Sequence, residues 1–397
     1  MHTPTIVVAA YNRPDALSRL LGSLAAADFP DGGGVPLVIS IDRSDSDAVA
    51  DVARAFDWAH GPKEVICHPE NLGLREHILR CGDLSQRGGG VIVLEDDLFV
   101  SRHFYDYVRR AMDHYGEDDR VAGISLYSHR TNPYLREPFV PVEDGSDVFF
   151  LQLASSWGQA WSALQWRRFR DWYGEGREVL ETDPVPWHVA RWPDSSWLKR
   201  FIKYMVETDR YFVYPRVSLT TNFGDPGTHF GRRDSMFQVP LLEAPCNFRF
   251  HSLDESVSVY DAHFEPTPAT VDRMTDRFHG VSYEVDLYRS KELEKVKADY
   301  LLTRRACSGA RQRFGAHMTP MVMNAVHGIE GEDIAFCPVG AVTERKARTG
   351  REHLENPTVS VPGQACRAPM SARQALFYAV RKALMEIMHM FGKGGRR

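Results

Sequence analysis

Three consecutive acidic residues, Glu95, Asp96 and Asp97, directly follow the apolar run at residues 91–94 (VIVL). Neighbouring carboxylates at the end of a buried strand repel each other and lose hydration, and a bound cation offsets both costs. Mg²⁺ and Mn²⁺ prefer carboxylate, phosphate and water oxygens, and the protein often supplies only one or two ligands. The triplet therefore indicates a site for Mn²⁺ or Mg²⁺ with a diphosphate, although a solvated acidic turn has the same composition.

Side chains alternate in direction along a strand, so Asp96 and Asp97 are not expected to point the same way. We expect one of them to bind the metal directly and the other to act through water or a ribose.

The elements that position this triplet alternate between short apolar runs and helical patterns. Strands are predicted at residues 5–10, 36–41, 64–68 and 91–94, and helices at 15–27, 48–56 and 72–84. This alternation predicts right-handed βαβ units and an open, largely parallel sheet, which is an α/β fold. Ligands of such sheets gather at the carboxyl ends of the strands, where Arg13, Asp42 and the triplet all lie.

Composition narrows the class of protein. A chain of 397 residues that is 43% hydrophobic and 25% charged is typical of a soluble globular protein. The net charge of −5 gives no basic field for nucleic acid. Six scattered cysteines without a C-x-x-C pair favour neither zinc nor a disulfide framework and fit a reducing cytoplasm. We find no signal-peptide pattern and no apolar run of spanning length, so we expect a cytoplasmic chain that is at most peripheral to a membrane.

Several ordered motifs resemble one enzyme family. Residues 5–14 (TIVVAAYNRP) resemble the opening of GT-A glycosyltransferases, and residues 91–107 (VIVLEDDLFVSRHFYDY) resemble the E-D-D segment of the N-acetylglucosaminyltransferase I family and of related bacterial enzymes that build surface polysaccharides. Three more stretches follow in the family's order: residues 38–42 (VISID), 74–77 (LREH) and 218–229 (SLTTNFGDPGTH). The resemblance covers about residues 5–235 and implies a Rossmann-like mixed sheet with helices on both faces.

The resemblance implies roles for individual positions around a nucleotide sugar. Asp97 would be the direct metal ligand, and Asp96 would help hold the ribose or a metal-bound water. The nucleotide would be bordered by the residues Ala10, Tyr11, Arg13, Asp42, His77 and Glu95. Asp42 would accept a hydrogen bond from a uracil ring, and His229 would lie near the diphosphate or acceptor. Simpler interpretations stay open: Arg13 could cap a turn, Asp42 could cap a helix, and Glu95 and the histidines could be structural.

A carboxylate that takes the proton of an acceptor hydroxyl is needed for transfer with inversion. Family members carry an acidic residue beside a tryptophan before the S-L-x-x-N-x-G segment, and Asp194 occupies that place. Ser195 and Ser196 stand where some relatives have acids, so the register of the match stays open by one or two residues. Asp194 could instead cap a helix expected at residues 195–206.

Residues 155–161 (SSWGQAW) resemble a loop that floors the sugar and acceptor site in bacterial relatives. Trp157 could stack on a sugar ring, and Gly158 would allow a close backbone approach. A tryptophan-rich core corner is the alternative.

The predicted organisation has four parts. Residues 1–235 form the catalytic domain, with a nucleotide half at about 1–110 and an acceptor half at about 111–235. Residues 236–335 pack on it, 336–370 form a polar, loosely ordered segment, and 371–397 form a basic amphipathic helix. That helix carries six basic residues against one acidic residue, so it could lie on an anionic membrane or pack on protein.

Together these features predict an inverting, metal-dependent glycosyltransferase. The expected donor is a UDP-sugar, and the expected acceptor is a glycan or lipid-linked glycan of a bacterial surface polysaccharide. A sugar nucleotidyltransferase would need a Gly-rich, basic phosphate loop, which residues 11–14 (YNRP) do not provide. A glycan-binding protein without catalysis is the second alternative.

Overall fold

The computed structural model describes residues 2–30, 32–225 and 237–347. Residues 1–130 and 139–347 belong to one compact unit, and residues 131–138 fall in a second unit together with 348–397. Within the second unit the described residues form a short hairpin of β7 (Thr131–Asn132) and β8 (Glu137–Pro138). The candidate site lies in the first unit.

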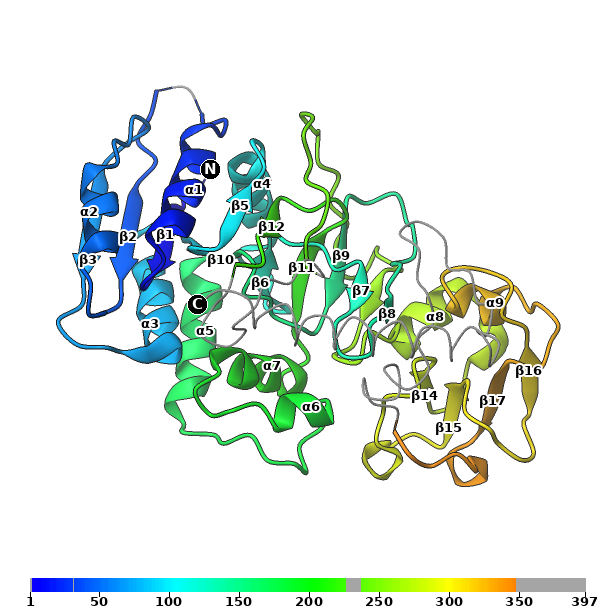
Figure 1. Cartoon of the computed structure of the whole chain (residues 1–397). Coiled ribbons are helices and arrows are strands. Elements are labelled where there is room, and N and C mark those ends of the chain that lie inside the picture. The colour runs from blue at the N-terminus through cyan, green and yellow to red at the C-terminus, as the bar shows by residue number, and fades with distance from the viewer. Residues whose placement is uncertain (1, 31, 226–236, 348–397) are drawn as a thin grey trace, which may run out of the picture. The chain divides into compact units, whose positions relative to one another are not determined.

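A nine-stranded mixed sheet forms the centre of the first unit (Figure 1). Its strands, in spatial order, are β13 (Val259–Tyr260), β9 (Val148–Leu151), β11 (Tyr211–Pro215), β6 (Val121–Ser125), β10 (Gln159–Trp161), β4 (Val91–Glu95), β1 (Thr5–Ala10), β2 (Leu37–Ile41) and β3 (Lys63–Cys67). The four strands β4, β1, β2 and β3 are mutually parallel, and β10 runs antiparallel to both of its neighbours. The predicted α/β fold with a large mixed sheet is confirmed.

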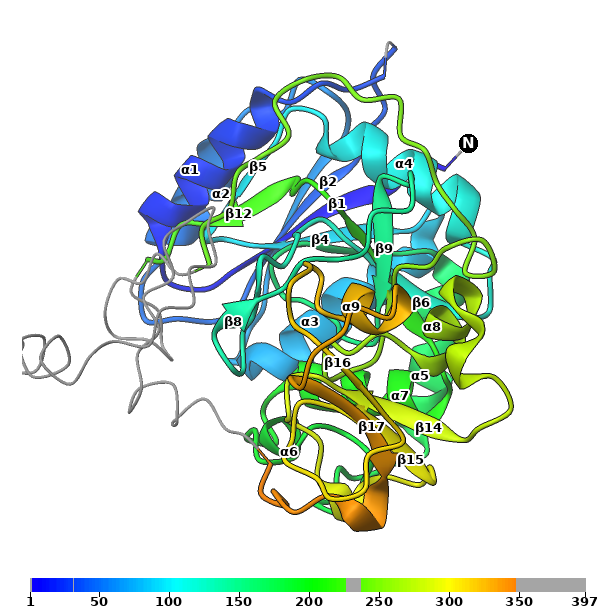
Figure 2. The same ribbon diagram turned by 90° about the vertical axis from the view of Figure 1, so that its right-hand side faces the viewer.

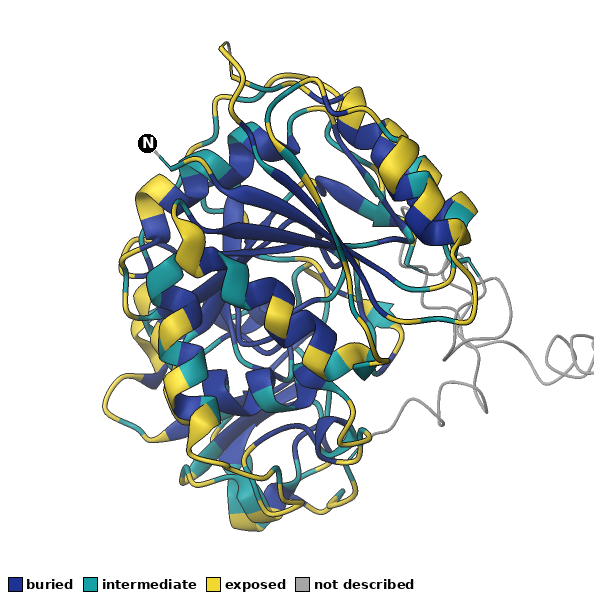
Figure 3. Cartoon of the chain, turned by 90° about the vertical axis from the view of Figure 1, so that its left-hand side faces the viewer, coloured by how far each residue is buried: buried dark blue, intermediate teal, exposed yellow. Residues whose placement is uncertain are grey.

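Helices cover both faces of this sheet, because its parallel strands are apolar on both sides. Ile6 and Val8 point into a core that includes Leu17 and Leu20 of α1 (Pro14–Ala25). Residues of α2 (Ala48–Ala55) and α4 (Phe104–Tyr115) belong to the same core. Val7 faces the other side, where α3 (Gly73–Asp83) contacts β1 and β4. Figure 3 shows the central strands buried along most of their length.

The second helical face is built on aromatic rings. Trp161 of β10 lies 4.6 Å from Trp166 of α5 (Ala163–Gly174), measured between ring centroids. The Trp161 ring also contacts Trp197 and Phe201 of α7 (Trp197–Glu207). The short helix α6 (Trp187–Ala190) precedes α7. These contacts place Trp161 and Trp166 in the core, where both side chains are fully buried.

A four-stranded sheet follows in the chain (Figure 2). Its order is β14 (Tyr283–Asp286), β15 (Tyr300–Thr303), β17 (Ile334–Pro338) and β16 (Gln312–Phe314). The helices α8 (Pro268–Met274) and α9 (Val322–Val326) contribute Val271 and Ala325 to its core. Short 3₁₀ turns lie at Leu84–Arg87, Asp276–Phe278, Leu293–Lys295 and Val339–Ala341.

This second sheet continues past the predicted boundary at residue 335. Strand β17 ends at Pro338 and pairs with both β15 and β16, because residues 334–337 (IAFC) are an apolar, fully buried run. The sequence interpretation placed the change to polar chain at about residue 335, although residues 336 and 337 are still apolar, and so cut through this strand. The rest of the predicted polar segment and the predicted helix 371–397 lie outside the described residues. Among the described helices, none combines the length and apolarity that a bilayer crossing needs.

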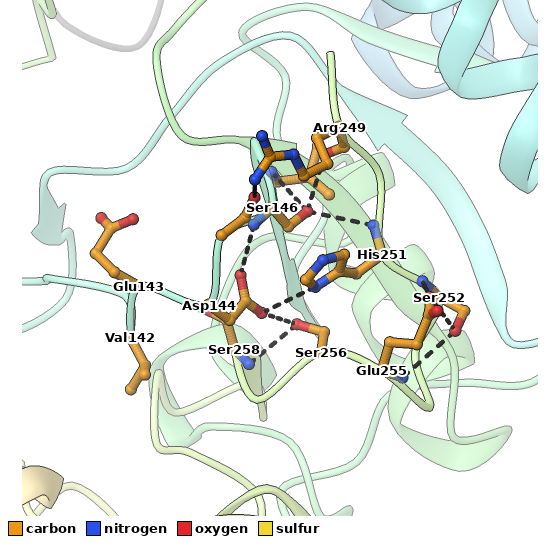
Figure 4. Close-up of polar contacts among 12 residues, drawn as sticks. Val142, Glu143, Asp144, Ser146, Arg249, His251, Ser252, Glu255, Ser256 and Ser258 are labelled. Atoms are coloured by element: carbon orange, nitrogen blue, oxygen red, sulfur yellow. Dashed lines mark hydrogen bonds and ion pairs between the residues drawn. The ribbon is translucent and has the colours of Figure 1, made fainter.

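A buried carboxylate fastens the long connection between β12 (Thr220–Asn222) and β13 to the sheet. Asp144 accepts hydrogen bonds from Ser146 N at 3.1 Å, Ser256 Oγ at 2.6 Å and Arg216 Nη2 at 2.8 Å. The His251 ring points at the same carboxylate (Figure 4). These bonds lower the pKa of Asp144 although burial acts in the opposite direction. The cluster is a structural anchor for the chain that follows the candidate site.

Candidate active site at the carboxyl edge of the sheet

Strand directions bring the site residues to one edge. The parallel strands β1, β2 and β4 end at Ala10, Ile41 and Glu95, and the strand order reverses between β1 and β4. Such a switch point leaves a crevice beyond the carboxyl ends. Because β10 is antiparallel to β4, with Gln159 opposite Val93, the residues before Gln159 lie at this same edge. Trp157 therefore reaches the crevice from the opposite chain direction.

A cavity of about 540 Å³ occupies this edge. The residues predicted from sequence that line it are Ala10, Tyr11, Arg13, Asp42, His77, Glu95, Asp96, Asp97 and Trp157. Three further groups line it: Asn71, Gly73 and Leu74; Ser195, Ser196 and Trp197; and Asn222, Gly224, Asp225 and Phe237. The structure thus brings together residues from the first, second and third hundred positions of the chain.

The acidic triplet converges on one arginine. The Arg13 guanidinium donates to Asp97 Oδ2 at 3.1 Å through Nη1 and to Asp96 Oδ1 through Nη2. Strand β4 ends at Glu95, and Asp96 and Asp97 form a turn before β5 (Leu98–Val100). The turn interrupts the alternation of side chains. The two carboxylates were expected to point in different directions, and this is wrong, because both contact Arg13.

Three carboxylate oxygens of the triplet lack a partner. Glu95 Oε1, Asp96 Oδ2 and Asp97 Oδ1 are enclosed and make no hydrogen bond in the described part of the chain. Burial, joined by the charges of its two neighbours, raises the pKa of Glu95 to about 8. Burial also raises the pKa of Asp96 to about 6, although Arg13 acts to lower it. Buried carboxylates are usually paired or bound to metal, so one arginine leaves this cluster short of positive charge.

These orphaned oxygens fit a divalent cation. Asp97 Oδ1 and Asp96 Oδ2 are hard oxygen ligands of the kind that Mg²⁺ and Mn²⁺ select. No group of three or more His, Cys, Asp or Glu side chains is arranged to hold a metal in residues 2–30, 32–225 and 237–347. A cation here would therefore take only one or two ligands from the protein and the rest from a bound ligand and water.

Asp42 holds the start of α3. Its Oδ1 accepts from Leu72 N at 2.8 Å and from Arg43 N at 2.9 Å, and its Oδ2 accepts from Gly73 N at 3.1 Å. A carboxylate has about four acceptor positions, so one position on Oδ2 is left for a ligand. The capping role that the sequence left open is thus present, on α3 instead of the helix that follows Asp42 in the chain.

His77 lies on α3 and is buried at the wall of the cavity. Its Nε2 is 2.9 Å from the hydroxyl of Ser40 on β2. Burial lowers the pKa of His77 to about 4, with Asp42 acting weakly in the other direction. The ring is therefore neutral near pH 7 and can offer one donor and one acceptor.

Trp157 forms an aromatic wall with Phe237. Their ring centroids are 4.5 Å apart, and Tyr127 and His129 back the indole. The Trp157 carbonyl accepts from Thr220 Oγ1 at 2.5 Å. Gly158 has φ +95°, and a Cβ there would lie 2.9 Å from Thr220. Gly158 does not line the cavity but permits the turn that presents Trp157.

Asp194 is placed at the rim. Its side chain is 79% exposed and lies 3.1 Å from Lys199 Nζ. Hydrogen bonding to Lys199 lowers the pKa of Asp194. Helix α7 is capped by Ser196, whose hydroxyl accepts from Lys199 N, so Asp194 is not the cap. Ser195 and Ser196 line the cavity, and Asp194 does not.

Sequence reasoning missed a second arginine–carboxylate pair. Arg19 of α1 pairs with Asp225, and its guanidinium carbon lies 3.9 Å from the centre of the Phe223 ring. Phe223 N donates to the Asp97 carbonyl at 3.0 Å, which ties this segment to the acidic turn. The pair spans 206 positions, and no short motif signals it. His229 lies outside the described residues.

Comparisons with known proteins agree with the motifs. No protein-family model matches the chain. It is 25% identical over 255 residues to an alpha-1,3-mannosyl-glycoprotein 2-beta-N-acetylglucosaminyltransferase of Arabidopsis thaliana, over 61% of this chain and 51% of that protein. This chain resembles the N-acetylglucosaminyltransferase I family. It spans about half the length of that curated relative.

Two solved structures match part of the chain. Residues 1–349 of S. aureus TarS match with a TM-score of 0.35 and 13% identity, covering 55% of this chain and 59% of that one. A mannosyltransferase of Pyrobaculum calidifontis, in complex with GDP-Man and Mn²⁺, matches with a TM-score of 0.31 and 15% identity, covering 44% and 47%.

Proposed function

We propose that the chain is a glycosyltransferase that moves a sugar from a nucleoside-diphosphate sugar to a hydroxyl of a glycan or lipid-linked glycan. The observation that carries the proposal is the cavity at the switch point of the sheet. This cavity is lined by carboxylate oxygens that lack partners, by an arginine, by an acceptor position on Asp42 and by an aromatic wall. We propose a UDP-sugar as donor, because Asp42 Oδ2 can accept the N–H of a uracil ring.

Asp97, helped by Asp96, would hold Mn²⁺ or Mg²⁺ through the oxygens that lack partners. When bound, the cation stabilises the negative charge that grows on the departing nucleoside diphosphate. Arg13 already lies against both carboxylates and adds a positive charge on the same side. Together they make the cavity attractive to a diphosphate although the bare triplet repels one.

The acceptor side is built by the aromatic wall and by the start of α7. Trp157 and Phe237 line the cavity, and we propose that their rings contact the C–H groups of a sugar. We propose Asp194 as the general base: its carboxylate takes the proton of the acceptor hydroxyl while that oxygen bonds to the anomeric carbon with inversion. This role requires the exposed Asp194 side chain to turn from Lys199 toward the cavity once an acceptor is bound.

The test combines binding and turnover. Thermal unfolding is measured with UDP, other nucleoside diphosphates and UDP-sugars, with and without Mn²⁺. We expect a metal-dependent rise in melting temperature for wild type, loss of that rise in Asp97→Ala, and its retention in Asp194→Asn with transfer lowered about 10²- to 10⁴-fold. Asp51→Asn, an exposed carboxylate on α2, is the matched control. Full transfer by Asp194→Asn would remove that residue from the mechanism.

The exposure of Asp194 favours one second candidate, a protein that binds the nucleotide sugar without transferring it. In that case nucleotide and metal would stabilise wild type and Asp194→Asn equally, and neither would release nucleoside diphosphate from any donor. Release above the rate of a heat-inactivated sample would reject this candidate.

We further propose that the acceptor belongs to a bacterial surface polysaccharide and that residues 371–397 hold the chain at the inner face of the cytoplasmic membrane. These residues carry a charge of six minus one, or +5. Anionic lipid attracts such segments by about 1 kcal/mol per basic residue. Cosedimentation with anionic vesicles should be lost when the chain ends at residue 370, and equal binding of both forms would contradict this role.

A further inference from the structure

Ser40 makes contact with two histidines through one oxygen. Its hydroxyl lies 2.9 Å from Nε2 of His77 and 3.0 Å from Nε2 of His68. Ser40 is buried in β2, and the His68 and His77 rings meet edge to face at 5.3 Å between centroids. His77 lines the cavity, whereas His68, half-buried after β3, does not. The hydroxyl therefore connects a residue of the site to one outside it.

One hydroxyl proton cannot serve two imidazole nitrogens. Ser40 can donate to one Nε2 and must accept from the other, so the two rings need opposite protonation at Nε2. Burial raises the pKa of the Cys81 thiol to about 12, although Ser40 acts to lower it, so the thiol remains protonated. A thiol sulfur is a weaker acceptor than an imidazole nitrogen, so the Ser40 O–H donates its hydrogen bond to a histidine instead of to the thiol.

Because the neutral ring carries one proton, the protonation of Nε2 determines whether Nδ1 of His77 is protonated. If Ser40 donates to Nε2 of His77, then Nδ1 carries the proton and is a donor; if His77 donates to Ser40, then Nδ1 is an acceptor. Nε2 contacts the Ser40 hydroxyl, and His77 lines the cavity, so we assign the other ring nitrogen, Nδ1, to a ligand. Burial keeps His77 neutral near pH 7, so tautomer choice is its remaining freedom.

We propose that Ser40 and His68 are positioning residues that set the tautomer of His77 and thereby select which nucleotide base the cavity accepts. This inference rests on the proposed function, because it assigns the cavity's ligand a nucleobase. Uracil presents a carbonyl oxygen at the position where cytosine presents an amino group. A donor at Nδ1 therefore favours uracil, and an acceptor at Nδ1 favours cytosine.

The first test is spectroscopic and needs no ligand. Long-range ¹H–¹⁵N correlation spectra at about pH 8, above the ordinary histidine pKa of about 6.5, report which nitrogen of each ring is protonated. We expect opposite tautomers for His68 and His77 in wild type and in Ser40→Thr, which keeps the hydroxyl. Ser40→Ala should free the two rings from each other. The same tautomer on both rings of wild type would overturn the inference.

The second test measures base selection. The ratio of UDP to CDP affinity, with Mn²⁺ present, should change about 3- to 10-fold in Ser40→Ala and in His68→Ala, the size expected for one hydrogen bond. Ser40→Thr should restore the wild-type ratio. Cys67→Ala is the control, since Cys67 lies beside His68 but contacts Arg54 instead of the serine.

The outcomes separate the two proposals. Nucleoside diphosphates that bind with the wild-type ratio in both Ser40→Ala and His68→Ala would overturn this inference alone. If no nucleoside diphosphate binds wild type, the proposed function fails, and base selection by His77 fails with it.

Discussion

Two arginine–carboxylate clusters of this chain differ in how completely their charges are compensated. In the second sheet, Arg305 donates to Asp286 Oδ2 at 2.6 Å and to the carbonyls of Arg289, Lys291 and residues 344–346. Asp286 Oδ1 accepts from Lys291 N, and both side chains of the pair are fully buried. At the sheet edge, Arg13 serves two carboxylates of a triplet that keeps three oxygens without partners.

The difference separates a structural pair from a binding site. A buried pair in which every guanidinium N–H group and both carboxylate oxygens have a protein partner serves the fold. A cluster with excess negative charge and unused oxygens is costly in the free protein and can recover that cost when a cation and a phosphate bind. An arginine with carboxylates therefore serves the fold in one place and a ligand in the other, and the hydrogen-bond partners distinguish the two roles.

The largest effect should come from breaking the structural pair. Arg305→Met leaves the Asp286 carboxylate buried and unpaired, so we expect the free energy of unfolding to fall by about 3–5 kcal/mol. Arg13→Met should cost only about 1 kcal/mol, because Arg13 is 25% exposed beside a cavity that water can enter. Urea unfolding of both variants measures the two losses of stability. Equal losses would contradict the difference between the structural pair and the binding site.

The second effect is a pH dependence of the metal-free protein. The pKa of Asp96 is about 6 when folded, against an ordinary 3.8, so the folded state binds the proton more tightly than the unfolded chain. Its stabilising contribution is present below about pH 4 and is lost as the pH rises through about 6, up to ~3 kcal/mol. Urea unfolding in chelator should show this slope, and Asp96→Asn should reduce it between about pH 4 and 6, while the raised pKa of Glu95 keeps a slope of the same sign up to about pH 8. An unchanged slope in the variant would mean that the pKa of Asp96 is not raised in the folded protein.

The smallest effect on stability is expected from a substitution in the acidic triplet itself. Asp97→Asn removes a negative charge that repels its neighbour Asp96, so stability without metal should stay within about 1 kcal/mol of wild type or rise. Stabilisation by Mn²⁺ with UDP should disappear in the same variant. A large loss of stability without metal would show that Asp97 serves the fold as Asp286 does.

The convergence of Arg13, Asp42 and the triplet could be predicted from sequence, because parallel strands bring their carboxyl ends to one edge. The shared contact of Asp96 and Asp97 with Arg13 could not, since it depends on where β4 stops and the turn begins. Position along the chain placed Asp194 beside the right helix but did not show its side chain at Lys199.

Contacts between distant segments were beyond sequence reasoning. The contact of Ser40 with His68 and His77 depends on the register between β2 and β3 and on the position of α3. Likewise, the contact of Phe237 with Trp157 joins two residues that lie far apart in the sequence. No periodicity or motif encodes such meetings.

The most direct test of the central claim is calorimetric titration of wild type with UDP, with and without Mn²⁺. We predict binding that requires the metal, and a matched loss of binding in Asp97→Ala, because the triplet lines the cavity and its unpartnered oxygens are the proposed cation ligands. Equal UDP affinity with and without Mn²⁺, or UDP binding unchanged by Asp97→Ala, would contradict the account.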